Sequence, residues 1–238
     1  MNTTIKCSKE RKKQLLVDLC LITIISLTIL GVLGLVGNKM TDFAYDSSVN
    51  IVLRVAVIGI GAQFGISGLG ICIVCFVRKE KFTEFGLNTK NLIPALLLSL
   101  VCCVPDFIYC LYRGWVHAWC PFLDVNTTPE VLASPFPYNV LAYLITAACW
   151  GFFEGFNYVV IRDKISELLP SKYRFWDWGA FICAVLCILI HGAVGVTPDA
   201  LLEMIVTMIL IYGMLIVRKE TGNAWGCVFI FFVYWNAL

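Results

Sequence analysis

Three polar residues whose side chains could take part in catalysis lie within apolar stretches of this chain: Glu154, His191 and Asn236. A carboxylate removed from water becomes a stronger base, which suits general-base catalysis near neutral pH. A neighbouring imidazole can share a water molecule or a metal ion with it, and an asparagine amide can donate to an oxyanion. Together these residue types supply the parts for hydrolysing a peptide bond inside a membrane.

A purely structural role is the alternative for the same three residues, because polar side chains also hydrogen-bond between helices and hold a bundle together. At a rise of 1.5 Å per residue, Glu154 and His191 differ in height by roughly 10 Å. Helix tilt and side-chain reach would have to close that gap. The site hypothesis therefore depends on where these two helices end and how they tilt.

Four other charged residues in apolar runs have simpler explanations. Asp18, Arg54 and Glu203 each lie about one turn from the end of a run, and Arg54 can extend its head group to polar surroundings. Asp106 follows Pro105 and fits a kinked helix. We predict structural roles for all four.

Metal binding is a second possibility for Glu154 and His191, with zinc as the ion. Cys183, Cys187 and His191 also recur every four residues along one helix face. Successive turns of a helix place side chains about 6 Å apart, which is awkward for a single ion. We therefore keep Glu154 and His191 as the tentative ligand pair.

The twelve cysteines do not indicate a disulfide-rich protein, because most lie in apolar runs, where cysteine behaves as a small hydrophobic residue. Cys72 and Cys75 lie in such a run and are discounted as ligands for the same reason. Cys110 and Cys120 bracket a segment that we place outside the membrane. A single bridge between them is conceivable, although spacing alone does not establish one.

Composition sets the class of protein. The chain is 60% hydrophobic and only 14% charged, whereas soluble domains are about one quarter charged. A bilayer can accommodate this much apolar surface and a soluble fold of this length cannot. The net charge of +2 and the absence of a basic patch exclude nucleic acid as a partner.

Seven apolar runs predict an all-α, polytopic bundle of about seven membrane-spanning helices, because about 20 residues cross the hydrocarbon core. The last run is short and either stops inside the bilayer or tilts into a crevice. No internal repeat is visible, which argues against a transporter built from duplicated halves. The runs are 15–37, 51–77, 92–112, 138–161, 178–196, 200–217 and 224–238.

The connections alternate in basic character. Lys and Arg gather in 1–14, 78–91 and 162–174 and at Arg218 and Lys219, whereas the intervening connections carry few. Basic connections mark the cytoplasmic side. We therefore expect a multi-pass protein of the cell membrane with its N-terminus in the cytoplasm and its C-terminus outside.

Three motifs in the second half of the chain resemble those of the CPBP intramembrane metalloproteases, which include type II CAAX prenyl endopeptidases and bacteriocin-processing or self-immunity proteins. That family carries Glu-Glu-x-x-x-Arg, then Phe-x-x-x-His, then His-x-x-x-Asn on successive helices. The counterparts here are 154–159, 187–191 and 232–236, and the inner segment 84–88 is similar to a Phe-Gly-Leu segment of the family. The resemblance divides the chain into a basic N-terminus (1–14), two N-terminal helices (15–77) and a CPBP-like core (78–238).

The resemblance implies roles for the residues that match. Glu154 would be the general base, His191 its partner or a zinc ligand, and Asn236 an oxyanion donor. Three positions depart from the family: Gly155 replaces the second Glu, Val159 the Arg and Phe232 the last His. Loss of one oxyanion donor costs about 10²–10³ in rate, so activity is expected to be low or lost.

Three function classes remain open. The first is an intramembrane peptidase that hydrolyses a membrane-associated peptide or protein. The second is a non-catalytic membrane protein on the same scaffold, serving bacteriocin self-immunity or peptide binding. The third is a small proton-coupled permease in which Glu154 and His191 relay protons. Catalytic turnover and proton flux would discriminate among them.

Overall fold

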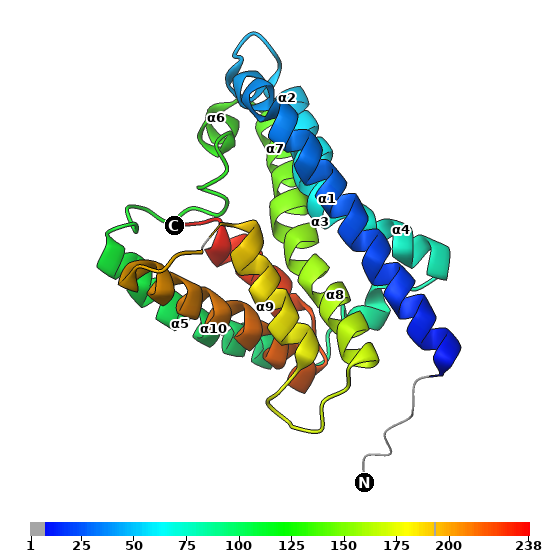
Figure 1. The fold of residues 1–238 in the computed structure, drawn as a ribbon. Coiled ribbons are helices and arrows are strands. Elements are labelled where there is room, and N and C mark those ends of the chain that lie inside the picture. The colour runs from blue at the N-terminus through cyan, green and yellow to red at the C-terminus, as the bar shows by residue number, and fades with distance from the viewer. Residues whose placement is uncertain (1–7, 193) are drawn as a thin grey trace.

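The computed structural model describes residues 8–192 and 194–238, and every regular element in that part of the chain is a helix. α5, α9 and α10 pack beside one another, while α1 packs along α4 and α8 (Figure 1). Residues 1–7 of the predicted basic N-terminus lie outside the described residues. The elements are α1 Lys9–Tyr45, α2 Ile51–Ile58, η1 Gly59–Phe64, α3 Gly65–Ser67, α4 Leu69–Arg78, η2 Phe82–Phe85, α5 Leu92–Arg113, α6 Thr128–Ala133, α7 Tyr138–Thr146, η3 Ala147–Phe153, α8 Glu154–Leu168, α9 Trp178–Ile190, α10 Pro198–Thr221, α11 Trp225–Ile230 and η4 Phe231–Trp235.

Local sequence signals set several helix ends. α9 begins where the Asp177 carboxylate accepts a hydrogen bond from Ala180 N at 2.9 Å, which satisfies a free N–H of the first turn. α10 begins with Pro198 after Thr197, whose hydroxyl accepts from Ala200 N at 3.2 Å. α10 ends at Thr221 and is capped by Gly222, whose φ of +71° suits a residue without a side chain.

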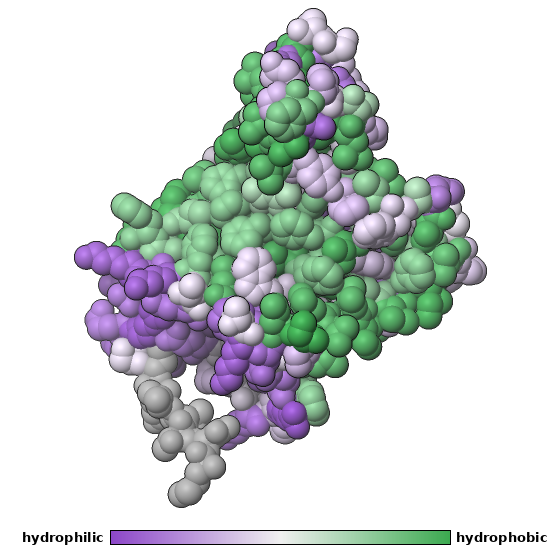
Figure 2. Space-filling view, turned by 180° about the vertical axis from the view of Figure 1, so that it is seen from behind, coloured by the Kyte–Doolittle hydropathy of each residue, from purple (hydrophilic) through white to green (hydrophobic). Residues whose placement is uncertain are grey.

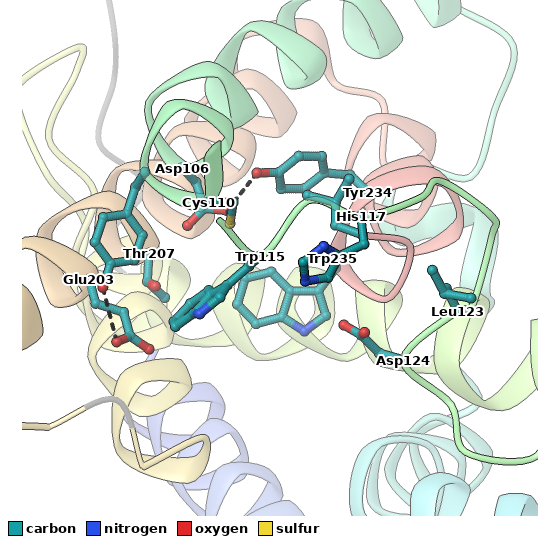
Figure 3. A pocket seen from close by; sticks show the side chains of 12 residues that line it. Asp106, Cys110, Trp115, His117, Leu123, Asp124, Glu203, Thr207, Tyr234 and Trp235 are labelled. Carbon is teal, nitrogen blue, oxygen red and sulfur yellow. Dashed lines mark hydrogen bonds between the residues drawn. The ribbon is translucent and has the colours of Figure 1, made fainter. Parts of the chain in front are cut away.

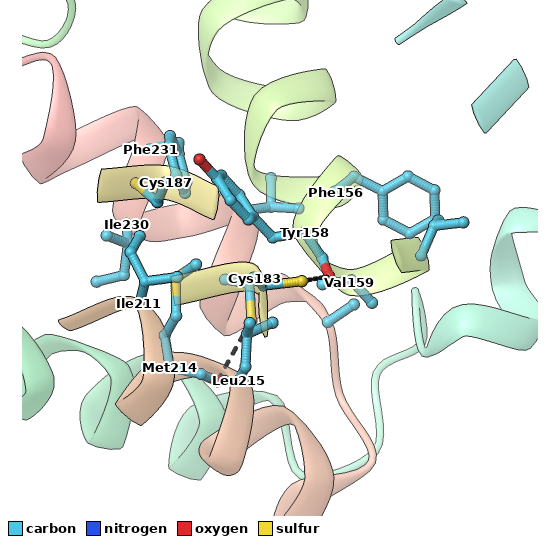
Figure 4. Packing of buried hydrophobic residues seen from close by; sticks show 14 of the residues in the cluster. Phe156, Tyr158, Val159, Cys183, Cys187, Ile211, Met214, Leu215, Ile230 and Phe231 are labelled. Atoms are coloured by element: carbon cyan, nitrogen blue, oxygen red, sulfur yellow. Dashed lines mark hydrogen bonds between the residues drawn. The ribbon is translucent and has the colours of Figure 1, made fainter. Parts of the chain in front are cut away.

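The main core lies where α8, α9, α10 and α11 meet. Val159 of α8 lies toward Cys183 of α9 and Met214 of α10, whereas the Phe156 ring points to the other side of α8 (Figure 4), and all four are buried. Cys183 Sγ lies 3.6 Å from the carbonyl oxygen of Tyr158. Cys183 therefore packs as a core residue and is not available as a metal ligand.

Apolar side chains cover most of the middle of the surface, and hydrophilic residues gather toward one end (Figure 2). Leu35 and Phe76 are 87% and 85% exposed. A surface of this kind is compatible with a membrane protein, because lipid replaces water around it.

The predicted count of about seven spans is not confirmed. Four helical stretches are long and apolar enough to cross a membrane, or five if the pair 51–67 and 69–78, bent by 58°, is one span. α9 has 13 residues, about 20 Å of helix, which is short of a hydrocarbon core of about 30 Å. The stretch Trp225–Trp235 is also too short, as predicted for the last run.

Four segments that we predicted to be basic lie together at one end of the molecule, which we call the basic end. Glu80, from the segment after α4, accepts from Lys164 of α8 at 2.7 Å and lies 3.5 Å from Arg11 of α1. Lys219 of α10 donates to the carbonyl oxygen of Arg174 at 2.8 Å. The basic segments that the sequence predicts on one side of the membrane are therefore close to one another in space.

The four charged residues with predicted structural roles have protein partners. The Asp18 carboxylate accepts from Arg78 at 2.7 Å and Lys164 at 3.0 Å. Arg54 does not extend to polar surroundings as we expected, because it is 1% exposed and bonds Glu130 and two backbone carbonyl oxygens. A buried guanidinium needs such partners to offset its desolvation.

Candidate functional site

The centre of the candidate site is the carboxylate of Glu154, the first residue of α8. Glu154 is 6% exposed. Gln63 Nε2, from η1, donates to Glu154 Oε2 at 2.7 Å. Burial and a directed hydrogen bond fix the orientation of the carboxylate, leaving its other oxygen to face a different partner.

That partner is His191, the residue that caps the C-terminus of α9. Its Nε2 lies 3.9 Å from Glu154 Oε1, and its side chain is 40% exposed. The separation is too long for a direct hydrogen bond and admits one water molecule that contacts both atoms. The expected height difference is absent, because α8 continues to Leu168 and does not end at residue 161 as predicted. Counted at 1.5 Å per residue from the ends of α8 and α9 at the basic end, Glu154 and His191 therefore lie at about the same height.

The Asn236 amide completes the set. Its side chain lies close to the Glu154 carboxylate, and the hydrogen bond that its Nδ2 donates goes to the Trp150 carbonyl oxygen at 3.5 Å. The main-chain carbonyl oxygen of Asn236 accepts from Asp124 N at 3.2 Å. The structure therefore brings together all three residues that the sequence singled out.

Each of three polar side chains at the centre is carried by a π-helical turn or directly follows one. Gln63 lies within η1, Glu154 follows η3 and Asn236 follows η4. η1 contacts η3, and η3 contacts η4. Because π-helical turns inside α-helices are rare and frequent at functional sites, their convergence around one carboxylate supports a functional centre.

Gln63 was missed by the sequence analysis. It lies in the glycine-rich run 51–77 and is not among the polar residues predicted to form the site. A signal existed, since Gln63 is the only carboxamide in that run. Buried amides need hydrogen-bond partners, so it deserved the same attention as Asn236.

Asn157 supplies further polar capacity on α8. It lies three residues after Glu154, on the same side of the helix. Its Oδ1 is buried and has no hydrogen-bond partner among the described residues. A buried water is the usual partner of such an atom.

The donor set does not fit a zinc centre. Catalytic zinc is held by about three protein ligands plus a water, and here the Glu154 and His191 side chains are only two. Among the described residues, no three His, Cys, Asp or Glu side chains are grouped so that they could hold a metal ion. Glu154 and His191 alone therefore fall one ligand short of a catalytic zinc set.

Two of the departures from the family motifs are explained by packing. A Cβ atom at Gly155 would lie 2.9 Å from Val228 Cα, so no larger residue fits there without a shift. The ring of Phe232 lies against Gly151, where a Cβ atom would be 2.7 Å from it. Val159 is fully buried in the main core.

The remaining cysteine predictions have clear outcomes. Cys110 and Cys120 are both free thiols, so the conceivable bridge between them is not formed. Cys187 is fully buried in the main core. Cys72 and Cys75 are likewise free.

A pocket of about 620 Å³ lies beside the site (Figure 3). Glu154 and His191 do not line it. Trp235 connects the two places, because it lines the pocket and its ring lies edge-to-face with the His191 ring at 5.3 Å between centroids. The volume is in the range of small-molecule and side-chain binding pockets.

Comparison of the chain with protein-family models, with curated proteins and with solved structures finds no match. The likeness to CPBP proteases therefore remains a prediction from the motifs quoted above.

Proposed function

We propose that this protein is an intramembrane peptidase in which Glu154 activates water for attack on a peptide bond near the membrane surface. The observation that carries the proposal is the 3.9 Å separation between Glu154 Oε1 and His191 Nε2. A carboxylate and an imidazole at this distance can hold one water between them. The partly exposed His191 gives that water a route to the buried carboxylate.

The chemistry needs one proton carrier. Glu154 takes a proton from the water as the water oxygen bonds to the carbonyl carbon of the peptide. It later delivers that proton to the departing amine as the C–N bond breaks. Asn236 can donate an N–H to the oxyanion that forms between these steps. Gln63 holds the carboxylate in place throughout.

A cell-membrane location with the N-terminus in the cytoplasm is part of the proposal. Long apolar helices and the shared position of the basic segments support it. On this orientation the pocket beside the site opens toward the outer side, opposite the basic end.

A non-catalytic peptide-binding protein is the second candidate, and Phe232 is the observation that favours it. A phenyl ring cannot donate a hydrogen bond, so the oxyanion would have one donor fewer than in the family. Such a protein would bind a membrane peptide without cutting it, as expected for self-immunity.

Turnover by purified protein in lipid nanodiscs, measured by mass spectrometry on a set of membrane-spanning peptides, tests the proposal. We expect cleavage by the wild type, and loss of at least about 10²-fold in rate for Glu154→Gln and His191→Ala. Glu84→Gln, at the basic end, is the matched control and should cleave normally. Equal rates in all four proteins would refute the site, and peptide binding without any cleavage would favour the second candidate.

A further inference from the structure

The pocket beside the site is acidic, and its acids have no cationic partners. Asp106, Asp124 and Glu203 line it. None of the three forms an ion pair with a Lys or Arg of the described chain. Asp106 accepts from Tyr234 Oη at 2.6 Å and Glu203 from Tyr109 Oη at 3.4 Å. Hydroxyl partners leave the negative charge uncompensated.

One arginine, Arg113, lies against the wall of the pocket but does not pair with its acids. It donates to Tyr109 Oη at 3.1 Å. Arg113 lies 3.6 Å from Asp199, and its guanidinium stacks over the Trp115 ring with its centre 4.8 Å from the centroid. Neither Arg113 nor Asp199 lines the pocket. The three carboxylates of the pocket are therefore not neutralised by a Lys or Arg of the described chain, and a bound cation would pair with them.

Thr207 gives an independent indication that the pocket receives a hydrogen-bonding ligand. It lies on α10, is 6% exposed and lines the pocket. Threonines in other helices here bond the carbonyl oxygen four residues earlier, as Thr146 does at 3.1 Å, but the Thr207 hydroxyl has no such partner within the described chain. The buried side-chain atoms without a partner in the described chain do not include its oxygen, so the hydroxyl is open to the pocket and can bond a ligand group there.

The walls suit an organic cation better than a metal ion. The rings of Trp115, Tyr234 and Trp235 lie among the acids (Figure 3), and Tyr109 also lines the pocket. The ring of Trp115 already carries the Arg113 guanidinium, which leaves Tyr234 and Trp235 to face a ligand. Aromatic faces attract ammonium and guanidinium groups and pack against the methylene stems that carry them. A volume of about 620 Å³ exceeds what a bare metal ion fills.

We propose that this pocket binds a lysine or arginine side chain of the peptide on which the protein acts. The inference rests on the proposed function for its choice of a peptide, and Trp235 provides the link because it contacts both the pocket and His191. A basic residue anchored here would hold the neighbouring backbone beside Trp235. The pocket is therefore a specificity determinant for basic peptides.

Binding to the nanodisc-embedded protein tests this separately from cleavage. The probes are two fluorescein-labelled peptides, identical except that one contains arginine and the other citrulline, its uncharged isostere. All measurements use Glu154→Gln protein, so that neither cleavage nor its absence affects the result. We expect the arginine peptide to bind at least about tenfold more tightly, the value of one charge-assisted hydrogen bond.

Three variants in that background locate the preference. Glu203→Gln keeps an acceptor for Tyr109 but removes the charge, and should abolish the preference, while Thr207→Val should reduce it. Glu84→Gln, at the basic end and far from the pocket, is the matched control and should leave it unchanged. A preference equal in Glu203→Gln and Glu84→Gln would overturn the assignment.

The source of the cation is tested with agmatine, which carries a guanidinium and an amine without a peptide backbone. We expect it to compete at least about tenfold more weakly than the arginine peptide. Equal competition would mean that the pocket takes a free amine, and equal binding of both peptides would reject the proposal. Because no arm measures hydrolysis, failure here is distinguishable from failure of the proposed function.

Discussion

At the scale of single residues, the Glu154 carboxylate is held from two directions. Gln63 donates to one oxygen at 2.7 Å, and His191 faces the other at 3.9 Å. Removing a donor leaves the buried acceptor without a hydrogen bond, and this destabilises the folded protein because no water replaces the lost bond. Gln63 is therefore expected to position Glu154.

We predict that Gln63→Leu lowers the free energy of unfolding by about 1–3 kcal/mol. Unfolding in detergent, followed by circular dichroism, measures this. The effect should shrink when Glu154 is replaced by Leu, because no buried carboxylate then remains to satisfy. Equal costs in both backgrounds would show that the two side chains are not coupled.

Gly155 should not tolerate a side chain. Gly155→Ala would put a Cβ atom 2.9 Å from Val228 Cα, and overpacking of this kind costs about 1–3 kcal/mol. Gly61→Ala is the matched control, since nothing lies within 4 Å of a Cβ atom there. Thermal unfolding of both variants decides the matter, and similar melting temperatures would contradict the packing explanation.

The sequence revealed three of the four central residues because each interrupts an apolar run. Glu154, His191 and Asn236 are conspicuous on that basis, and their types already predict the chemistry. Gln63 is also conspicuous, as the only carboxamide in its run, but it was not singled out. Its role depends on Glu154, 91 residues away, and nothing near Gln63 in the sequence identifies that partner.

At the scale of helices, a buried ionic network joins α1, α4 and α8. Lys164 is 2% exposed and lies 3.0 Å from Asp18 and 2.7 Å from Glu80. Arg78 bonds the second oxygen of Asp18 at 2.7 Å. Each buried charge depends on the others, so the network fixes how α1 docks on the rest of the molecule.

Lys164→Met should therefore lower the free energy of unfolding by about 3–5 kcal/mol, because Asp18 is left buried with one partner fewer. Arg174→Met, which breaks an exposed pair with Glu220, should cost at most about 1 kcal/mol. Chemical unfolding in detergent compares the two. A cost below that of Arg174→Met would show that the network does not hold α1.

The N-terminus of α9 should respond to acid. Burial alone would raise the pKa of Asp177, but hydrogen bonds from Arg162, Ala180 N and Ser166 outweigh it and hold the pKa below its usual value. A lowered pKa in the folded state stabilises the protein above the unfolded-state pKa of about 3.9. That stabilisation is lost as the pH falls through the folded-state pKa.

Melting curves of wild type and Asp177→Asn between pH 3 and pH 7 test this. We expect the wild type to be more stable at pH 6 and its advantage to decline below about pH 4. An advantage independent of pH would mean that the charge of Asp177 contributes nothing.

The helix ends show where prediction from apolar runs fails. Hydropathy placed the end of the fifth helix near residue 196, whereas Gly192, with a φ of +68°, follows the His191 cap. Glycine just after a helix is a known end signal, so His191-Gly192 contained the information. The π-helical turns carry no comparable signature, because their residues are as apolar as the α-helices around them.

At the scale of the whole molecule, composition correctly predicted an all-helical, apolar protein. It did not predict the number of spans, because hydropathy measures apolarity and not the length of unbroken helix. α9 is as apolar as a spanning helix but too short. Such a helix is stabilised inside the bundle by its neighbours.

The prediction at this scale concerns which side of the membrane each connection faces. Single cysteines at Arg174 and Asn126, placed in a variant with its native cysteines replaced, should react with an impermeant maleimide from opposite sides of sealed vesicles. Arg174→Cys lies at the basic end and should be labelled from the cytoplasmic side only. Labelling of both from one side would reject the proposed topology.

The three π-helical turns make the site sensitive to length as well as to residue type. A π turn contains one residue more than the α-helical turn it replaces. Wound at regular α-helical pitch, the same seven residues of η3 would rotate all that follows by about 100° relative to what precedes. Glu154 would then turn away from Gln63. An inserted or deleted residue outside these turns would cause the same rotation, so natural variation in this protein should include substitutions around the carboxylate far more often than single-residue insertions or deletions in the helices that carry it.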